Sequence, residues 1–401
     1  MLSIPRRHFL IAAAGTAGAA ASSLTPLGSR PALAQESENG SGSLPEPFGS
    51  KIADSLIVHS ELTLETERDA IGTSGITAKD ILYVRNNLPT PSEEIVADPD
   101  AWEVQIEGVR EPRSVTVGEL KSMGVETVST VLQCSGNGRG FFDHETSGSQ
   151  WLTGAAGNLL WSGVPVRDVV EALGGLEDGR NFMTSTGGED LPEGVDESQV
   201  VVERSIPVDH AMEHGILAWE MNGEPVPLIH GGPLRVVIPG YYGINNVKYV
   251  RRVAFTEEES DASIMRTSYR VRPVGVEGAP DQPSMWEMKV KSWITRPLAD
   301  VESGRVLLYG VAFGGINALE RVEVSTDGGE NWQEARLLGP DLGRFAWQPF
   351  VLSAELEPGT YTVTSRATDS EGRVQEEVTE PNHRGYDYSG WRVLAVDVTV
   401  V

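Results

Sequence analysis

The stretch LERVEVSTDGGENWQEARL, residues 319–337, predicts two β-strands joined by a tight turn. Apolar and polar residues alternate on both sides of an Asp-Gly pair, which is a strong short-range signal for a hairpin. Around this hairpin, further strand-like runs are separated by turn residues: MKVKSWITRP (288–297), GRVLLYGVAFGG (304–315), WQPFVLSAEL (347–356), GTYTVTSRATD (359–369) and WRVLAVDVTVV (391–401). About six or seven short strands without a helical run predict an immunoglobulin-like β-sandwich over residues 285–401.

The chain changes character at a Pro/Gly-rich joint, VGVEGAPDQPS (274–284). Before this joint, residues 51–273 alternate strand-like runs such as WEVQIEGV (102–109) with helix-like runs such as PVRDVVEALGG (165–175). This pattern predicts a mixed α/β domain. The expected fold class is therefore α+β, with the mixed domain preceding the sandwich.

The N-terminus carries the features of a targeting segment. Residues 5–24, PRRHFLIAAAGTAGAAASSL, place Arg6 and Arg7 before a weakly apolar run, and ALA precedes Gln35. This indicates a twin-arginine signal peptide over residues 1–34, followed by a flexible polar linker at 35–50. We expect export by that pathway to a periplasmic or extracytoplasmic place, with no membrane span in the mature form.

Composition limits the partners that the protein can have. The formal net charge of −26 disfavours nucleic-acid binding, which needs basic patches for phosphate contact. An acidic surface suits either a basic protein partner, such as a small cytochrome, or a salty habitat. The single cysteine excludes a disulfide within the chain.

That cysteine, Cys134, lies in VLQCSGNGRGFF (131–142), among glycines and next to Arg139. A lone cysteine is usually a small buried hydrophobe without chemistry. Three other stretches of the mixed domain are nevertheless rich in cationic and amide side chains: YVRNNLPTP (83–91), IHGGPLRVVIPG (229–240) and GINNVKYVRRV (243–253). A thiolate together with surplus cations in an acidic protein indicates a site for an anionic, phosphate-bearing cofactor.

These stretches resemble the sulfite oxidase family of molybdenum–pterin enzymes. The same resemblance is carried by SGSQWLTGAAGNLLWSGVPVRDVV (147–170), WEMNGEPVPLIHGGPLRVVIPGYYGINNVKYVRRV (219–253) and NHRGYDYSGWRV (382–393). The resemblance runs from about residue 80 to the C-terminus. It implies that residues 51–273 form a molybdopterin-binding domain and that the sandwich serves dimerisation, so a homodimer is expected.

The resemblance also implies roles for individual residues. Cys134 falls on the molybdenum ligand, and a soft thiolate suits such a metal. The positions implied for the substrate pocket are Arg85, Arg139, Trp151, Tyr269 and Arg384. Those implied for the cofactor are Tyr83, Val84, Arg85, Asn86, Asn87, Asp190, His230, Arg235, Asn246, Val247 and Lys248. Asn87 stands where the family usually has a histidine.

The implied activity is molybdenum-dependent oxidation of sulfite to sulfate by oxygen-atom transfer. No Cys-x-x-Cys-His occurs, so we expect no haem in this chain and an external electron acceptor such as a c-type cytochrome. One alternative is a sulfane dehydrogenase subunit that acts on carrier-bound sulfur in thiosulfate oxidation. An alternative of another class is a secreted binding module without catalysis.

A second metal motif competes with this interpretation. HAMEH (210–214) fits His-x-x-Glu-His, the pattern of inverted zinc peptidases, with His210 and His214 one helical turn apart. A zinc site needs a third ligand from another element. Such short motifs arise by chance, so an ordinary helix is the favoured interpretation of this segment.

Overall fold

The structure is a computed structural model of the 401-residue chain, and it describes Leu44 and residues 47–401. The expected signal peptide lies outside the described residues, as does most of the expected linker. Within the described part, no helix is both long enough and apolar enough to cross a membrane.

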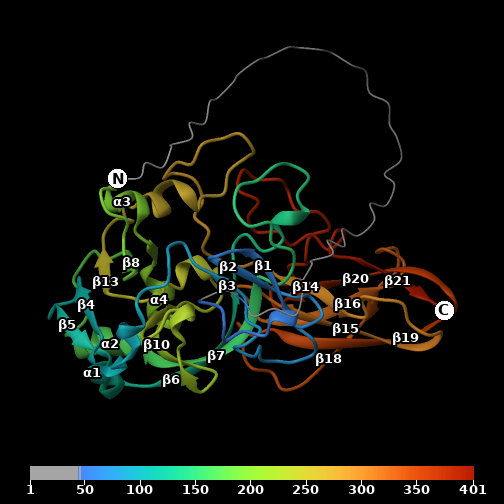
Figure 1. The fold of residues 1–401 in the computed structure, drawn as a ribbon, viewed down its shortest axis with the longest axis horizontal. Helices are drawn as coiled ribbons and strands as arrows, with labels where there is room; N and C mark the ends of the chain where they lie inside the picture. Colours follow the sequence, from blue (N-terminus) through green and yellow to red (C-terminus); the bar gives the residue numbers. More distant parts are fainter. Residues whose placement is uncertain (1–43, 45–46) are drawn as a thin grey trace, which may run out of the picture. The chain divides into compact units, whose positions relative to one another are not determined.

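The mixed domain contains three β-sheets (Figure 1), and strands that are neighbours in the orders that follow are hydrogen-bonded to each other. The first sheet joins β1 (Leu56–Ser60), β2 (Thr63–Thr66) and β3 (Val84–Arg85). The second joins β11 (Glu224–Pro225), β10 (Ile216–Met221), β7 (Ala156–Pro165) and β6 (Glu126–Gln133), with β12 (Arg235–Val237) also on β10. The third joins β5 (Arg113–Thr116), β4 (Glu103–Glu107), β13 (Arg252–Thr256), β8 (Phe182–Thr186) and β9 (Glu203–Pro207).

The helices of the described chain are short and lie in this domain: α1 (Val117–Met123), α2 (Val166–Ala172), α3 (Glu197–Val200) and α4 (Val208–His214). Helix α1 begins at a capping box, in which the Thr116 hydroxyl accepts from the Glu119 amide and the Glu119 carboxylate accepts from the Thr116 amide. Its apolar residues Val117 and Leu120 are buried, which places the helix against the domain core.

The C-terminal region is a sandwich of two antiparallel four-stranded sheets. One sheet has the order β14 (Lys291–Arg296), β15 (Gly304–Phe313), β19 (Gln348–Leu356) and β18 (Arg336–Leu337). The other has the order β17 (Gln333–Glu334), β16 (Leu319–Ser325), β20 (Gly359–Asp369) and β21 (Val396–Val400). The hairpin predicted from residues 319–337 is present, with Glu323 paired to Glu334, and the expected α+β class is confirmed.

The sandwich and the mixed domain share an apolar core. Trp293, Phe313 and Trp347 from the sandwich pack in one buried cluster with Val131 and Tyr242. This contact also brings the segment between β20 and β21, residues 370–395, against the loop that follows β6. There the amide of Asp387 donates to the carbonyl of Ser135 at 2.9 Å. A segment of the second domain therefore helps to hold the loop that contains the cysteine.

Candidate active site

Cys134 lies directly after β6, in a loop fixed by backbone hydrogen bonds. Its amide donates to the Ala155 carbonyl at 2.9 Å, and its carbonyl accepts from the Asn137 amide at 2.9 Å. The residue is 9% exposed. Gly138 in this loop has φ +97°, and a Cβ there would lie 2.6 Å from Tyr388. This glycine therefore allows the C-terminal segment to pack closely on the loop.

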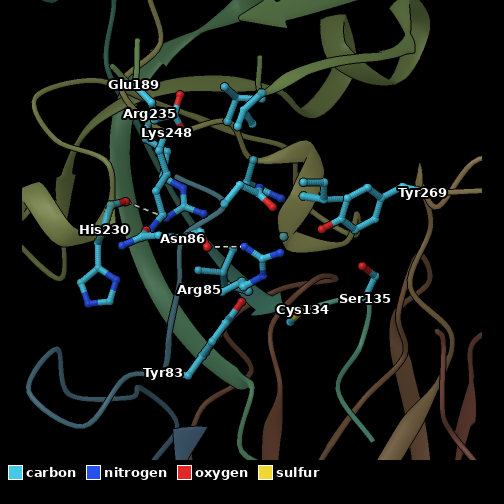
Figure 2. Close-up of a pocket in the computed structure, with 17 residues that line it drawn as sticks. Tyr83, Arg85, Asn86, Cys134, Ser135, Glu189, His230, Arg235, Lys248 and Tyr269 are labelled. Carbon is cyan, nitrogen blue, oxygen red and sulfur yellow. Dashed lines mark hydrogen bonds between the residues drawn. The ribbon is translucent and has the colours of Figure 1, made fainter. Parts of the chain in front are cut away.

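A pocket of about 640 Å³ extends from Cys134 into the mixed domain. Figure 2 shows Arg235, Lys248 and His230 on one side of it, with Tyr269 and Ser135 on the other. The lining includes these expected cofactor positions: Tyr83, Arg85, Asn86, Asn87, His230, Arg235, Asn246, Val247 and Lys248. The structure therefore gathers residues from four separate sequence motifs around one cavity.

The inner end of this pocket is rich in buried cations whose hydrogen-bond partners are neutral. Lys248 Nζ donates to the Asn86 side chain and, at 2.7 Å, to the Ile229 carbonyl. Arg235 donates to the His230 carbonyl at 2.7 Å, while its Nε is buried without a partner among the described residues. Burial lowers the pKa of Arg235 to about 10 and holds the pKa of Lys248 and of His230 well below their usual ranges. An anion in this pocket would relieve that cost.

A second pocket of about 660 Å³ meets the first at Cys134 and opens toward the second domain. Arg85, Arg139 and Arg384 all line it, although they come from β3, from the turn after Cys134 and from the C-terminal segment. Arg139 is oriented by its own hydrogen bonds, since Nε donates to the Arg384 carbonyl and Nη1 to the Ser149 carbonyl, both at 2.9 Å. Within the described part of the chain, the Nε of Arg384 is buried without a partner. Guanidiniums in this arrangement can bind an oxyanion.

A tyrosine stack connects the two domains at this second pocket. The rings of Tyr269 and Tyr386 are 5.3 Å apart and 5° from parallel, and the Arg139 guanidinium lies 5.5 Å from the Tyr386 ring. Tyr269 is an expected pocket residue, but Tyr386 is not. The position of Tyr386 in NHRGYDYSGW, two residues after Arg384, is a sequence signal that could have indicated Tyr386 as a pocket residue.

Three expected residues lie elsewhere. Asp190 is exposed outside both pockets, and its neighbour Glu189 lines the first pocket instead, with a pKa that burial raises to about 7. The chain turns after β8 ends at Thr186, so the motif TGGED alone did not reveal which carboxylate faces inward. Trp151 and Val84 are fully buried and line neither pocket; Trp151 packs edge-on against Tyr83, 6.3 Å between ring centroids.

The HAMEH segment is the short helix α4, and its first histidine is engaged by the fold. His210 Nε2 lies 2.9 Å from the Pro239 carbonyl, and the ring stacks on Tyr241 at 4.1 Å. Among the described residues, no three His, Cys, Asp or Glu side chains are grouped so as to hold a metal ion. The geometry favours the interpretation of an ordinary helix.

Comparison with known proteins points to one enzyme family. Residues 88–264 match the family model described as oxidoreductase molybdopterin binding domain, and residues 282–396 match the Mo-co oxidoreductase dimerisation domain. The chain is 33% identical over 356 residues to mitochondrial sulfite oxidase of Rattus norvegicus, covering 83% of this chain and 64% of that protein. It is 31% identical over 362 residues to sulfite oxidase of Arabidopsis thaliana, covering 82% of this chain and 90% of that protein.

The fold is also similar to a solved structure. The crystal structure of the sulfane dehydrogenase SoxCD from Paracoccus pantotrophus aligns with a TM-score of 0.71 and 24% identity, over 92% of this chain and 96% of that one. The chain spans 64% of the length of the rat relative, so it corresponds to a part of that longer protein.

Proposed function

The chain belongs to the sulfite oxidase family of molybdopterin oxidoreductases, and from this premise we propose that it oxidises sulfite to sulfate. The observation that carries the choice of substrate is the convergence of Arg85, Arg139 and Arg384 on the pocket beside Cys134. Several guanidiniums supply both the charge and the forked geometry that a dianionic oxyanion requires.

The described residues fit the cofactor that the family implies, molybdenum bound to molybdopterin. The buried cations of the inner pocket have neutral partners, and the unpartnered Nε of Arg235 suits a phosphate acceptor. The Asn246 side chain is used by the fold, because its Oδ1 accepts from the Ile238 amide at 2.8 Å. Any contribution of Asn246 to the cofactor therefore comes through its backbone. Cys134, which lines both pockets, would hold the metal end.

The molybdenum–pterin group, when bound, supplies oxygen-atom transfer and accepts two electrons. The residues of the chain bind and orient the substrate. Arg139 and Arg384 would hold the sulfite oxygens, so that the sulfur lone pair faces the Cys134 side of the pocket. The net reaction of sulfite and water gives sulfate, two protons and two electrons, and an external acceptor must take the electrons.

The test uses the purified, natively exported protein. We expect about one molybdenum and one pterin per chain. We also expect turnover of free sulfite with ferricyanide or cytochrome c as acceptor. The opposing result is that the molybdenum-loaded protein fails to oxidise free sulfite and acts on sulfur bound to an added carrier protein. That result would replace the proposed sulfite oxidation by a sulfane dehydrogenase activity, the activity named for the structural relative. Folded protein without molybdenum would instead support a binding module.

Three further properties belong to this proposal. Arg6 and Arg7 support export by the twin-arginine pathway to the periplasm or another extracytoplasmic place, where a c-type cytochrome is the proposed acceptor. The match of residues 282–396 to a dimerisation domain supports a homodimer through the sandwich. Cell fractionation tests the export, and sedimentation of the intact protein tests the dimer.

A further inference from the structure

A short N-terminal strap, residues 47–52, packs behind His230, which lines the inner pocket, and no sequence motif indicated this strap. Phe48 in this strap is fully buried and packs in a cluster with Ile229, the residue before His230. The Lys51 amide donates to the Phe48 carbonyl at 2.9 Å, and the Ile52 amide donates to the Asp80 carbonyl at 3.0 Å. The strap is therefore fixed against the turn η5 (Leu228–His230).

The Lys51 side chain reaches the imidazole of His230. Its Nζ lies 2.7 Å from His230 Nε2 and also donates to the carbonyls of Lys79 and Leu82, at 2.5 and 3.0 Å. Burial lowers the pKa of Lys51 to about 7, so below that pH the side chain is an ammonium group, with three hydrogens to donate and no lone pair to accept with. The three neighbours of Lys51 Nζ thus satisfy it completely, provided that His230 Nε2 is the acceptor.

This contact determines the form of the histidine. If Nε2 accepts a hydrogen bond, the imidazole is neutral and its proton is on Nδ1. The neutral state of the imidazole has further support, because burial first, and then Lys51, Lys248 and Arg235, hold the pKa of His230 well below its usual range. A histidine in a single tautomer presents one N–H donor in a fixed direction.

We propose that Lys51 is a positioning residue for the cofactor, acting through His230. It holds His230 as the Nδ1–H tautomer from behind the pocket, so that the histidine and the neighbouring Arg235 and Lys248 are arranged in advance for a phosphate group. The inference rests on the proposed cofactor, but not on the proposed substrate. It explains why a half-buried lysine reaches His230 from a strap that lines neither pocket.

The experiment measures cofactor release from loaded enzyme, by the fluorescence of the freed pterin and by molybdenum per chain after dialysis. Lys51→Met should release the cofactor about ten- to a hundredfold faster, the usual cost of losing a residue that supports a ligand. Lys79→Met is the matched control, since the Lys79 side chain is exposed and pairs with Glu224. It should release the cofactor at the wild-type rate. Equal release from wild type and Lys51→Met overturns the proposal.

A double-mutant cycle tests whether Lys51 acts through the histidine. In the His230→Gln background, Lys51→Met should add little to the release rate, because the contact is already absent. Additive effects of the two changes would overturn the positioning role and leave Lys51 as a structural residue. If Lys51→Met does not fold, Lys51→Arg, which keeps charge and donors, replaces it. The Lys51→Arg variant should release the cofactor more slowly than the His230→Gln variant. Equally fast release from these two variants contradicts the proposal.

The tautomer supplies a readout that does not depend on activity. With 15N-labelled histidine, the His230 signals are identified by their loss in His230→Gln. At a pH below 7, where Lys51 is protonated, wild type should show a protonated Nδ1 and an unprotonated Nε2, and Lys51→Met should lose this pattern. A protonated Nε2 in wild type would contradict the proposal. Wild-type protein without any pterin would contradict the proposed cofactor instead, so the two failures are distinguishable.

Discussion

The two pockets that meet at Cys134 use positive charge in different ways. In the inner pocket, His230, Arg235 and Lys248 are buried within one domain and are fixed by carbonyl and amide partners. In the outer pocket, Arg139 and Arg384 come from two domains, and the Arg384 Nε has no partner among the described residues. The inner cations are therefore arranged by the packing of one domain, whereas the outer arginines meet only because the two domains pack together.

The largest expected effect comes from Cys134, which lines both pockets and is the expected metal ligand. Cys134→Ser should lower sulfite turnover by more than about a hundredfold, because a hydroxyl is a poor ligand for a soft metal and even supporting residues cost ten- to a hundredfold. Molybdenum per chain should fall with the activity, as measured by metal analysis. A Ser variant with wild-type metal content and turnover would remove Cys134 from the metal site.

Arg384→Met tests whether the second domain contributes to the outer pocket. Losing one charge-assisted contact to a bound oxyanion should cost about 1.5–3 kcal/mol, or about ten- to a hundredfold in kcat/KM. Molybdenum content should not change, because the inner pocket is intact. Arg392→Met is the matched control, since Arg392 is exposed in the same segment and pairs with Glu377. Equal kcat/KM in the Arg384 variant and wild type would rule out this pocket for the substrate.

Glu189 and Asp190 offer a test of burial at the inner pocket. Burial raises the pKa of Glu189 to about 7 from an ordinary value of 4.5. The stability linked to the protonated carboxyl is therefore fully present below pH 4.5 and is lost as pH rises through 7. With allowance for solvent screening, we expect this to lower the free energy of unfolding of the cofactor-free protein by about 1–2 kcal/mol.

Denaturant unfolding at pH 5 and at pH 8 measures this linkage. Glu189→Gln should flatten the pH dependence relative to wild type. Asp190→Asn changes the adjacent but exposed carboxyl and should leave the dependence as in wild type. The same slope in Glu189→Gln and wild type would show that Glu189 is not the buried carboxyl that titrates.

The sequence predicted the parts of the fold that depend on local pattern. The hairpin at residues 319–337 follows from alternation, and helix α2 lies within the helix-like run at 165–175. Motif residues such as Cys134 and Arg235 were also predicted to share a site, and the structure brings them to one pocket. Which of two adjacent carboxylates faces inward depends on how the chain turns after β8, and TGGED does not contain that information.

Lys51 and Tyr386 show a second reason why prediction from sequence was incomplete. Each acts on a residue far away in the chain: Lys51 on His230, and Tyr386 on Tyr269. Such pairs exist only after distant segments pack. Lys51 lies outside the motifs, and although Tyr386 lies in NHRGYDYSGW, that motif does not show which ring it stacks on. The residues that line the pockets are concentrated in motifs, whereas Lys51, which contacts one of them from behind, is not.

The smallest expected effect concerns the tyrosine stack at the outer pocket. Tyr386 is 1% exposed and stacks on Tyr269, so its ring fixes a residue of the mixed domain from the second domain. An aromatic pair of this kind contributes about 0.5–1.5 kcal/mol beyond its buried area, so Tyr386→Leu should raise the KM for sulfite about two- to tenfold. Molybdenum content and kcat should change little, because the stack orients the pocket and does not touch the inner cations.

Two variants separate stacking from other effects. Tyr386→Phe keeps the ring and loses the hydroxyl, which donates to the Ser268 carbonyl at 3.3 Å and is hydrogen-bonded to the Arg384 side chain, so its KM should stay closer to wild type. Tyr361→Leu makes the same change in β20 of the sandwich and should leave KM unaltered. If Phe and Leu at position 386 raise KM equally, the hydroxyl matters rather than the ring. The outer pocket would then depend on the hydrogen bonds of this hydroxyl, to Ser268 and to Arg384, instead of on the stack.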